Sequence, residues 1–151
     1  MTQQQIENSL PPLVKTVTVP LSVDQAFSRF TEQMAAWWPL ETHSVGEQGA
    51  DTVTFEARAG GRIVETLKSG DTSVWGTVQE WEPPRRVVFT WHPGRDPSSA
   101  QQVEVQFNEG DGATEVVLTH RGWESFGDGA QQMWNRYDQG WSHVLDRFVG
   151  E

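Results

Sequence analysis

Cysteine is absent from the 151-residue sequence, which excludes disulfide bonds, thiol nucleophiles and cysteine-ligated zinc sites. Positive charge is also scarce, because 11 Lys and Arg residues stand against 21 Asp and Glu residues and leave a formal net charge of −10. This balance argues against nucleic acid as a partner and against docking on an anionic membrane surface, since both require a basic face. No apolar run of about 18 residues occurs, so we expect no membrane-spanning helix.

Cofactor and catalytic motifs are missing as well. The four His residues are scattered without metal-binding spacing, and Gly60-Gly61 lies in a hairpin signal and does not open a helix as nucleotide-binding glycines do. Ser125 lacks the G-x-S-x-G context of a hydrolase nucleophile. We therefore expect no metal, no cofactor and no side-chain nucleophile. The polar N-terminus has no signal-peptide pattern, which predicts a cytoplasmic protein.

Aromatic residues are unevenly represented. The sequence has 8 Trp and 7 Phe but a single Tyr, which is Tyr137. Tryptophan is large and carries one N–H group that needs an acceptor when it is buried. So many wide rings in a small protein either fill the core or line a pocket for a planar or apolar ligand.

The order of predicted elements places the chain in the α+β class. Residues 1–12 are expected to form a flexible tail and residues 13–151 a single domain. After a β-branched first strand, Ser22 is a favourable N-cap for a short helix that runs to Phe30. Residues 34–38 are expected to add another helical turn before Pro39.

Short alternating segments then indicate an antiparallel sheet. A polar loop at 40–50 comes first, and six segments of period two follow, separated by turn residues; they cover 52–57, 62–67, 74–81, 85–91, 101–107 and 114–120. Apolar residues at 133–148 recur at three- and four-residue steps, which predicts one long amphipathic helix. Gly140 interrupts this helix, and a close approach to the sheet is its expected reason.

The order of these elements, with several local motifs, resembles the START-like helix-grip superfamily. Within it, the chain is similar to the family of the activator of heat-shock protein 90 ATPase. The motifs are VPLSVDQAFSRF, WWP at 37–39, GGR at 60–62, WGTVQEWEPPRRVVFTW at 75–91, TEVVLTHRGW at 114–123 and QGW at 139–141. The resemblance spans about residues 13–148. It implies a curved antiparallel sheet of about seven strands wrapped around the C-terminal helix, with two short helices after the first strand and a cavity between sheet and long helix.

The ligand-binding candidates are the side chains that alternation and helical spacing direct toward this cavity. A single aromatic residue at such a position usually just fills the hydrophobic core. The prediction of a ligand site therefore depends on the whole group of residues. The set is Phe30, Trp37, Trp38, Phe55, Trp75, Phe89, Trp91, Phe107, His120, Trp134, Tyr137 and Trp141. The face that each residue of the segment 74–81 presents cannot be assigned from alternation.

His120 is the candidate acid or base, because it ends the apolar row Val116-Leu118-His120 and is expected to point inward at a rim. The interpretation that we favour over this one is a histidine that is hydrogen-bonded to backbone at a strand end. His43 is expected in a solvated loop, and His92 and His143 are expected on the outside because they fall out of phase with the apolar positions.

Three functions remain open, in this order. The first is binding of a small apolar or aromatic ligand in the cavity, gated by residues 40–50 or 121–130. The second is a cyclase- or hydrolase-like enzyme that uses His120, and the sequence does not decide whether a reaction is catalysed. The third is an interaction module, either a chaperone partner or a homodimer. The predicted outer face of the sheet is polar, with Arg85 and Arg86 expected opposite Glu80 and Glu82, which disfavours a large interface there.

Overall fold

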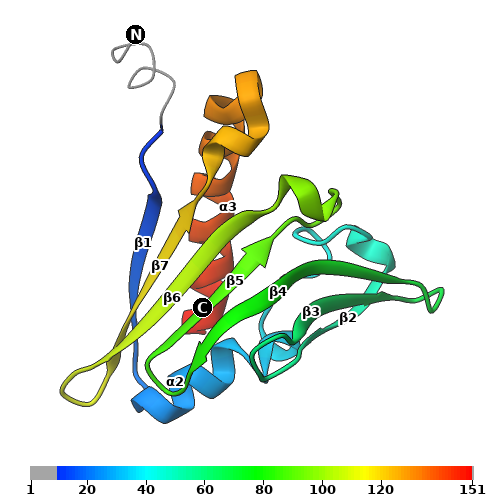
Figure 1. Cartoon of the computed structure of the whole chain (residues 1–151). Helices are drawn as coiled ribbons and strands as arrows, with labels where there is room; N and C mark the ends of the chain where they lie inside the picture. Colours follow the sequence, from blue (N-terminus) through cyan, green and yellow to red (C-terminus); the bar gives the residue numbers. More distant parts are fainter. Residues whose placement is uncertain (1–9, 151) are drawn as a thin grey trace, which may run out of the picture.

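The computed structural model describes residues 10–150, and these form one curved sheet packed on one long helix (Figure 1). The strands are β1 (Leu13–Val19), β2 (Ala50–Phe55), β3 (Arg62–Leu67), β4 (Thr72–Glu82), β5 (Arg86–Trp91), β6 (Gln101–Glu109) and β7 (Thr114–Arg121). The helices are α2 (Val23–Phe30) and α3 (Ala130–Val149), with short 3-10 turns η1 (Met34–Ala36), η2 (Glu47–Gly49), η3 (Pro97–Ser99) and η4 (Trp123–Gly129). The predicted α+β helix-grip fold is confirmed.

The seven strands form one antiparallel sheet in the order β1-β7-β6-β5-β4-β3-β2. Strands β2 to β7 follow one another as hairpins, and β1 pairs with β7, so β1 and β2 are the two edges. The helix α3 lies along one face of this sheet, and α2 lies near the end where the β4–β5 and β6–β7 turns are found (Figure 1). The predicted tail, residues 1–12, falls mostly outside the described residues.

The predicted cap of α2 is confirmed. The Ser22 hydroxyl accepts from the Gln25 backbone N–H, and the Gln25 side chain accepts from the Ser22 backbone N–H, which is a capping box. After Thr31 the expected further helical turn is present as the 3-10 turn η1, which is shorter than the predicted 34–38. The rest of this segment is a tight 3-10 turn that presents Trp37 and Trp38 to the core, where both are buried.

The core lies between α3 and the inner face of the sheet. The alternation predicted for β6 and β7 is confirmed, since Val103, Val105 and Phe107 and also Val116, Leu118 and His120 are buried. In β4 the strand is irregular, because Trp75 and Val78 are both buried although alternation would put them on opposite faces. At Gly76 the backbone carbonyl of Thr90 occupies the space that a Cβ would need, and this close approach accompanies the irregularity.

Two sequence expectations about single residues were wrong. Gly140 does not approach the sheet, because its Cβ position faces the His43 ring at 3.8 Å. His92 is only 4% exposed, not outside, because it follows the last residue of β5 and is no longer governed by the alternation of that strand. Its backbone N–H donates to the Trp75 carbonyl, which draws the chain inward.

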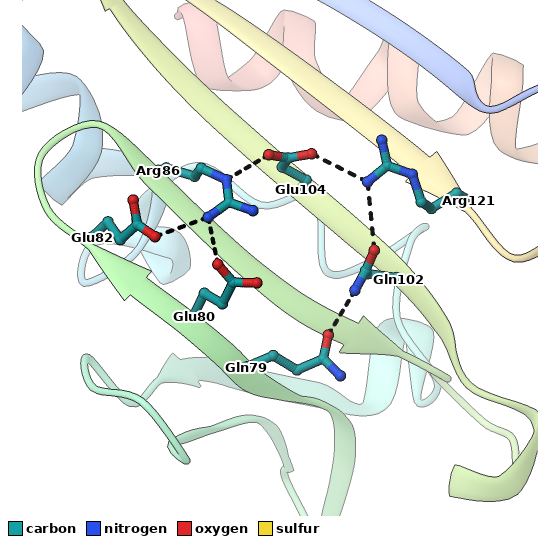
Figure 2. Close-up of polar contacts among 7 residues, drawn as sticks. All are labelled: Gln79, Glu80, Glu82, Arg86, Gln102, Glu104 and Arg121. Carbon is teal, nitrogen blue, oxygen red and sulfur yellow. Dashed lines mark hydrogen bonds and ion pairs between the residues drawn. The ribbon is translucent and has the colours of Figure 1, made fainter.

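The outer face of the sheet carries a connected polar network (Figure 2). Arg86 pairs with Glu80 at 2.6 Å and with Glu82 at 2.9 Å, as the sequence predicted, and also with Glu104 on β6. Arg121 on β7 pairs with the other oxygen of Glu104 at 3.1 Å. These contacts link β4, β5, β6 and β7 and lower the pKa of Glu104, chiefly through the Arg86 hydrogen bond. Each charged group of the network thus has an oppositely charged partner.

Candidate functional site

A hollow of about 750 Å³ opens where the C-terminal end of β5 meets the middle of α3. Loop residues 42–47 border it on one side and residues 93–95 on another. Its aromatic wall is made by Trp38, Trp91, Tyr137 and Trp141, and its charged and titratable lining residues are His43, Glu47, Arg95 and Arg136. The volume falls in the range that suits a small organic ligand.

The three tryptophans of the wall pack against one another. Their ring centroids are 5.9 Å apart for Trp38 and Trp91, 5.4 Å for Trp91 and Trp141, and 5.9 Å for Trp38 and Trp141. All three are buried. Two of these pairs are tilted, at 53° and 40°, and the third is edge-to-face at 87°. Such mutual packing holds the ring planes in place, so this wall of the hollow is rigid.

One indole N–H of this wall is unusual. Trp91 is 2% exposed, and within residues 10–150 its Nε1 is the single buried side-chain nitrogen or oxygen without a hydrogen-bond partner. Six of the eight tryptophans donate to a protein acceptor: Trp37 to Arg29 O, Trp38 to His43 O, Trp75 to Glu65 Oε1, Trp123 to His120 O, Trp134 to Pro11 O and Trp141 to His120 Nδ1. A buried donor without an acceptor costs about 1–3 kcal/mol. Trp91 is thus a lining residue of the hollow that carries an unsatisfied buried donor.

His120 lies behind the wall, not at its rim. It is 0% exposed, and both ring nitrogens are engaged. Its Nδ1 accepts from the Trp141 indole N–H at 3.0 Å, so the proton lies on Nε2, which donates to Gln101 Oε1 at 2.7 Å. Burial, with a smaller contribution from the positive charge of Arg95, lowers the pKa of His120 to about 3. The neutral imidazole thus orients Trp141, and the expected rim position is wrong.

The loop at one side of the hollow is tied down by Glu65. This residue is 0% exposed on β3, where its carboxylate accepts from the backbone N–H groups of Val45 and Gly46, each at 2.9 Å. It also accepts from the Trp75 indole N–H at 2.9 Å. Gly46 has no room for a Cβ, because the Leu67 side chain fills that place. Sequence reasoning missed this role, although the Gly in a polar loop was the available signal.

The same loop contacts α3 through histidines. His43 and His143 stack with centroids 4.9 Å apart, and the His43 carbonyl accepts from the Trp38 indole N–H. Burial lowers the pKa of His43, and the nearby His143 lowers it further, while Glu41 opposes the shift. The prediction of a solvated loop histidine is therefore incomplete, since the His43 ring packs on Gly140 and His143.

Only part of the predicted ligand-binding set lines this hollow. Trp38, Trp91, Tyr137 and Trp141 do, and they come from the segment that follows η1, from β5 and from α3. Trp134 lies elsewhere, with its indole N–H donating to the Pro11 carbonyl at 2.9 Å. The others pack in the core away from the lining: Phe30, Trp37, Phe55, Trp75, Phe89 and Phe107. Sequence reasoning did not anticipate Arg95 and Arg136, because a rim assembled from a loop and a helix leaves no local pattern.

A second hollow, of about 680 Å³, lies between α2 and the end of α3. Its charged lining residues are Asp24 and Arg29. The Arg29 side chain already has a partner, since its Nε donates to the Phe148 carbonyl at 2.8 Å and caps α3. Within residues 10–150 no cluster of three or more metal-ligating side chains occurs, and no helix is long and apolar enough to cross a membrane. The Trp-walled hollow is the stronger candidate site.

Comparisons with known proteins agree with this fold. The family model described as "Activator of Hsp90 ATPase homolog 1-like protein" matches residues 20–150. The chain is 32% identical to an anthrahydroquino-gamma-pyrone synthase, Txn09, solved in complex with SUM, covering 94% of this chain and 97% of that one with a TM-score of 0.62. No curated protein matches the sequence.

Two more distant structures share the fold. Protein BH1534 from Bacillus halodurans is 19% identical, with 94% of this chain and 96% of that one covered and a TM-score of 0.68. The Aha1 dimer from Colwellia psychrerythraea is 16% identical, with 90% and 91% covered and a TM-score of 0.64.

Proposed function

The chain belongs to the Activator of Hsp90 ATPase homolog 1-like family, and from that premise we propose that it binds a small, planar apolar or aromatic molecule in the Trp-walled hollow. The fold is a ligand-binding fold. The Txn09 synthase, of similar length, is in complex with SUM, which supports a ligand site in this chain too.

The observation that carries the proposal is the wall itself. Three packed tryptophans present flat surfaces to a hollow of about 750 Å³, and one of them, Trp91, retains a buried N–H without an acceptor. A planar ligand with an oxygen acceptor gains stacking against the rings and satisfies this donor. Either gain alone is worth about 1 kcal/mol, and the two act in the same place.

Catalysis in the same hollow is the second candidate, and the synthase relative at 32% identity favours it. The specific form in which His120 acts as acid or base is disfavoured, because the ring is buried and both nitrogens are engaged. The polar side chains that line the hollow are then the candidates to contact a substrate: Thr42, His43, Ser44, Glu47, Arg95, Arg136, Tyr137 and Gln139.

An interaction module is the third candidate and has less support. The outer face of the sheet is covered by paired charges, which makes it a poor docking surface. A homodimer stays a prediction, and the edges β1 and β2 are where a second copy would pair.

The test uses N-phenyl-1-naphthylamine, a neutral planar fluorophore, with the purified full chain. We expect saturable binding, and among the indole N–H signals in a ¹H–¹⁵N spectrum we expect that of Trp91 to move and that of Trp134 to stay. The Trp91→Phe variant replaces the indole with a smaller ring and removes its N–H donor. It should weaken binding about fivefold, a loss of roughly 1 kcal/mol.

Trp134→Phe is the matched control, because it removes an indole outside the hollow and should leave the affinity unchanged. If Trp91→Phe is poorly folded, Tyr137→Ala replaces it, since Tyr137 is a half-buried lining residue on α3. Absence of binding, or binding insensitive to both variants, contradicts the proposal.

A further inference from the structure

The charges around the hollow differ from those of the whole chain. The sequence carries a net charge of −10, yet the lining contains Arg95 and Arg136 and a single acidic residue, Glu47. A concave surface with an excess of one sign attracts ligands of the opposite sign. The hollow is therefore a locally cationic site on an acidic protein.

Arg95 is held in place without a carboxylate. Its Nη1 donates to the carbonyl and hydroxyl oxygens of Ser99 at 2.9 and 3.2 Å, and its Nη2 donates to the Trp91 carbonyl at 3.1 Å. The guanidinium lies over the Phe126 ring, 4.5 Å from its centroid. All these partners are neutral, so the positive charge is fixed in position but not neutralised.

Arg95 also has N–H groups that are not used in these hydrogen bonds. A guanidinium has five N–H groups, and three hydrogen bonds within residues 10–150 leave two of them for another acceptor. Because Arg95 Nη2 donates to the Trp91 carbonyl, the guanidinium lies at the same end of β5 as the unpartnered indole. Both residues line the hollow.

Arg136 adds a second cation from α3. It is exposed, and no hydrogen bond or ion pair joins it to another residue of the described part of the chain. Most other arginines are paired with glutamates: Arg58, Arg62, Arg86, Arg121 and Arg147. Within the described residues, four of the nine arginines have no carboxylate partner, and two of these four, Arg95 and Arg136, lie at the aromatic hollow.

Resting on the proposed function, we infer that the ligand class is an aromatic acid: a planar ring system that carries an anionic group, such as a carboxylate or sulfonate. The rings stack on Trp91 and Trp141, an oxygen of the ligand accepts from Trp91 Nε1, and the anionic group pairs with Arg95 and Arg136. Arginine suits this task because its planar fork matches an oxyanion.

The test compares two probes that differ by one anionic group. These are 1-anilinonaphthalene-8-sulfonate and the neutral N-phenyl-1-naphthylamine, titrated into the full chain at low salt. A charge-assisted hydrogen bond contributes enough for about a tenfold preference for the sulfonate, and added salt should reduce that preference. We expect this ratio of affinities in the unmodified protein.

Two substitutions test whether Arg95 and Arg136 cause the preference for the sulfonate probe. Arg136→Gln, on the exposed face of α3, should lower the ratio about threefold, and adding Arg95→Gln should bring it close to one. Each ratio is taken within one variant, so a change in the hollow that affects both probes equally cancels. Arg85→Gln is the matched control: it removes one exposed arginine at the β4–β5 turn, the opposite end of β5 from the hollow. Its ratio should equal that of the unmodified protein.

The outcomes separate the two proposals. If the neutral probe binds in the hollow but the sulfonate binds no better, or if the double variant keeps the preference, the aromatic-acid inference is wrong and the binding function stands. If neither probe binds, both are wrong. If the loss of Arg95 disturbs the 93–99 loop, the single variant Arg136→Gln decides the inference. An unchanged affinity ratio in that variant contradicts it.

Discussion

At the scale of single residues, burial decides what each polar side chain can do. His120 ends an apolar row, and the sequence left open whether it acts as acid or base. In the structure it accepts from Trp141, donates to Gln101 and stacks on Trp123 with centroids 4.3 Å apart. Those contacts use the neutral ring, so His120 holds the wall of the hollow in position and does not exchange protons near neutral pH.

The depressed pKa of His120 predicts a loss of stability in acid. The unfolded histidine binds a proton below about pH 6.5, whereas the folded one does so only near pH 3. Between these values the unfolded state binds more protons, so the free energy of unfolding falls as the pH falls. From pH 7.5 to pH 5, this group should cost about 2 kcal/mol of stability.

Urea unfolding at both pH values measures this effect. The comparison is with His120→Gln, which offers similar hydrogen-bonding groups and does not titrate, so other groups contribute equally to both proteins. The variant should lose less stability on acidification than the unmodified protein. Equal losses would show that His120 does not have the depressed pKa.

At the scale of elements, one buried carboxylate organises the site. Glu65 on β3 binds the 45–46 backbone and the Trp75 indole together, so the loop that borders the hollow is fixed to the sheet. The opposite border, residues 93–95, is held by Arg95 to Trp91 and Ser99. Both borders are loops that lack regular secondary structure and depend on side-chain contacts for their shape.

Glu65→Gln should therefore destabilise the protein by about 2 kcal/mol, because the amide cannot accept all three hydrogen bonds and leaves a buried donor unpaired. Hydrogen exchange of the Val45 and Gly46 amides should accelerate. The control is Glu109→Gln, an exposed residue at the end of β6. Similar unfolding free energies for the two variants would contradict the assigned role of Glu65.

At the scale of the whole molecule, every strand and both α-helices contribute to one core. Leu13 of β1, Phe30 of α2, Val53 of β2 and Phe148 of α3 belong to the same buried cluster. The paired charges of the outer face add contacts across β4 to β7 (Figure 2). No part of the described chain has an apolar core of its own.

We expect residues 13–151 to unfold as a single cooperative unit, as the sequence predicted for one domain. Urea transitions followed by tryptophan fluorescence, which reports on the core, and by far-UV circular dichroism, which reports on the helices and sheet, should have the same midpoint. Separated midpoints would divide the chain into two folding units.

The sequence by itself determined the elements and most of the core. Period-two segments, turn residues and the Ser22 cap act over a few residues, so local physical chemistry is sufficient to predict them. The same holds for the Arg86 pairs with Glu80 and Glu82, which lie within six residues. Family resemblance added the topology of the sheet around the helix, and the structure confirms it.

Only the tertiary structure decided which aromatic rings form the site. Trp75 and Trp91 are both buried strand residues, yet Trp75 donates to Glu65 and does not line the hollow, while Trp91 lines the hollow and has no acceptor. The hydrogen-bond partners of the tryptophans lie up to 123 residues away in sequence. Arg95 and Arg136 likewise meet at the mouth only because β5 ends against the middle of α3. Contacts between distant segments produce no periodic pattern in the local sequence, and these contacts set the shape and charge of the hollow.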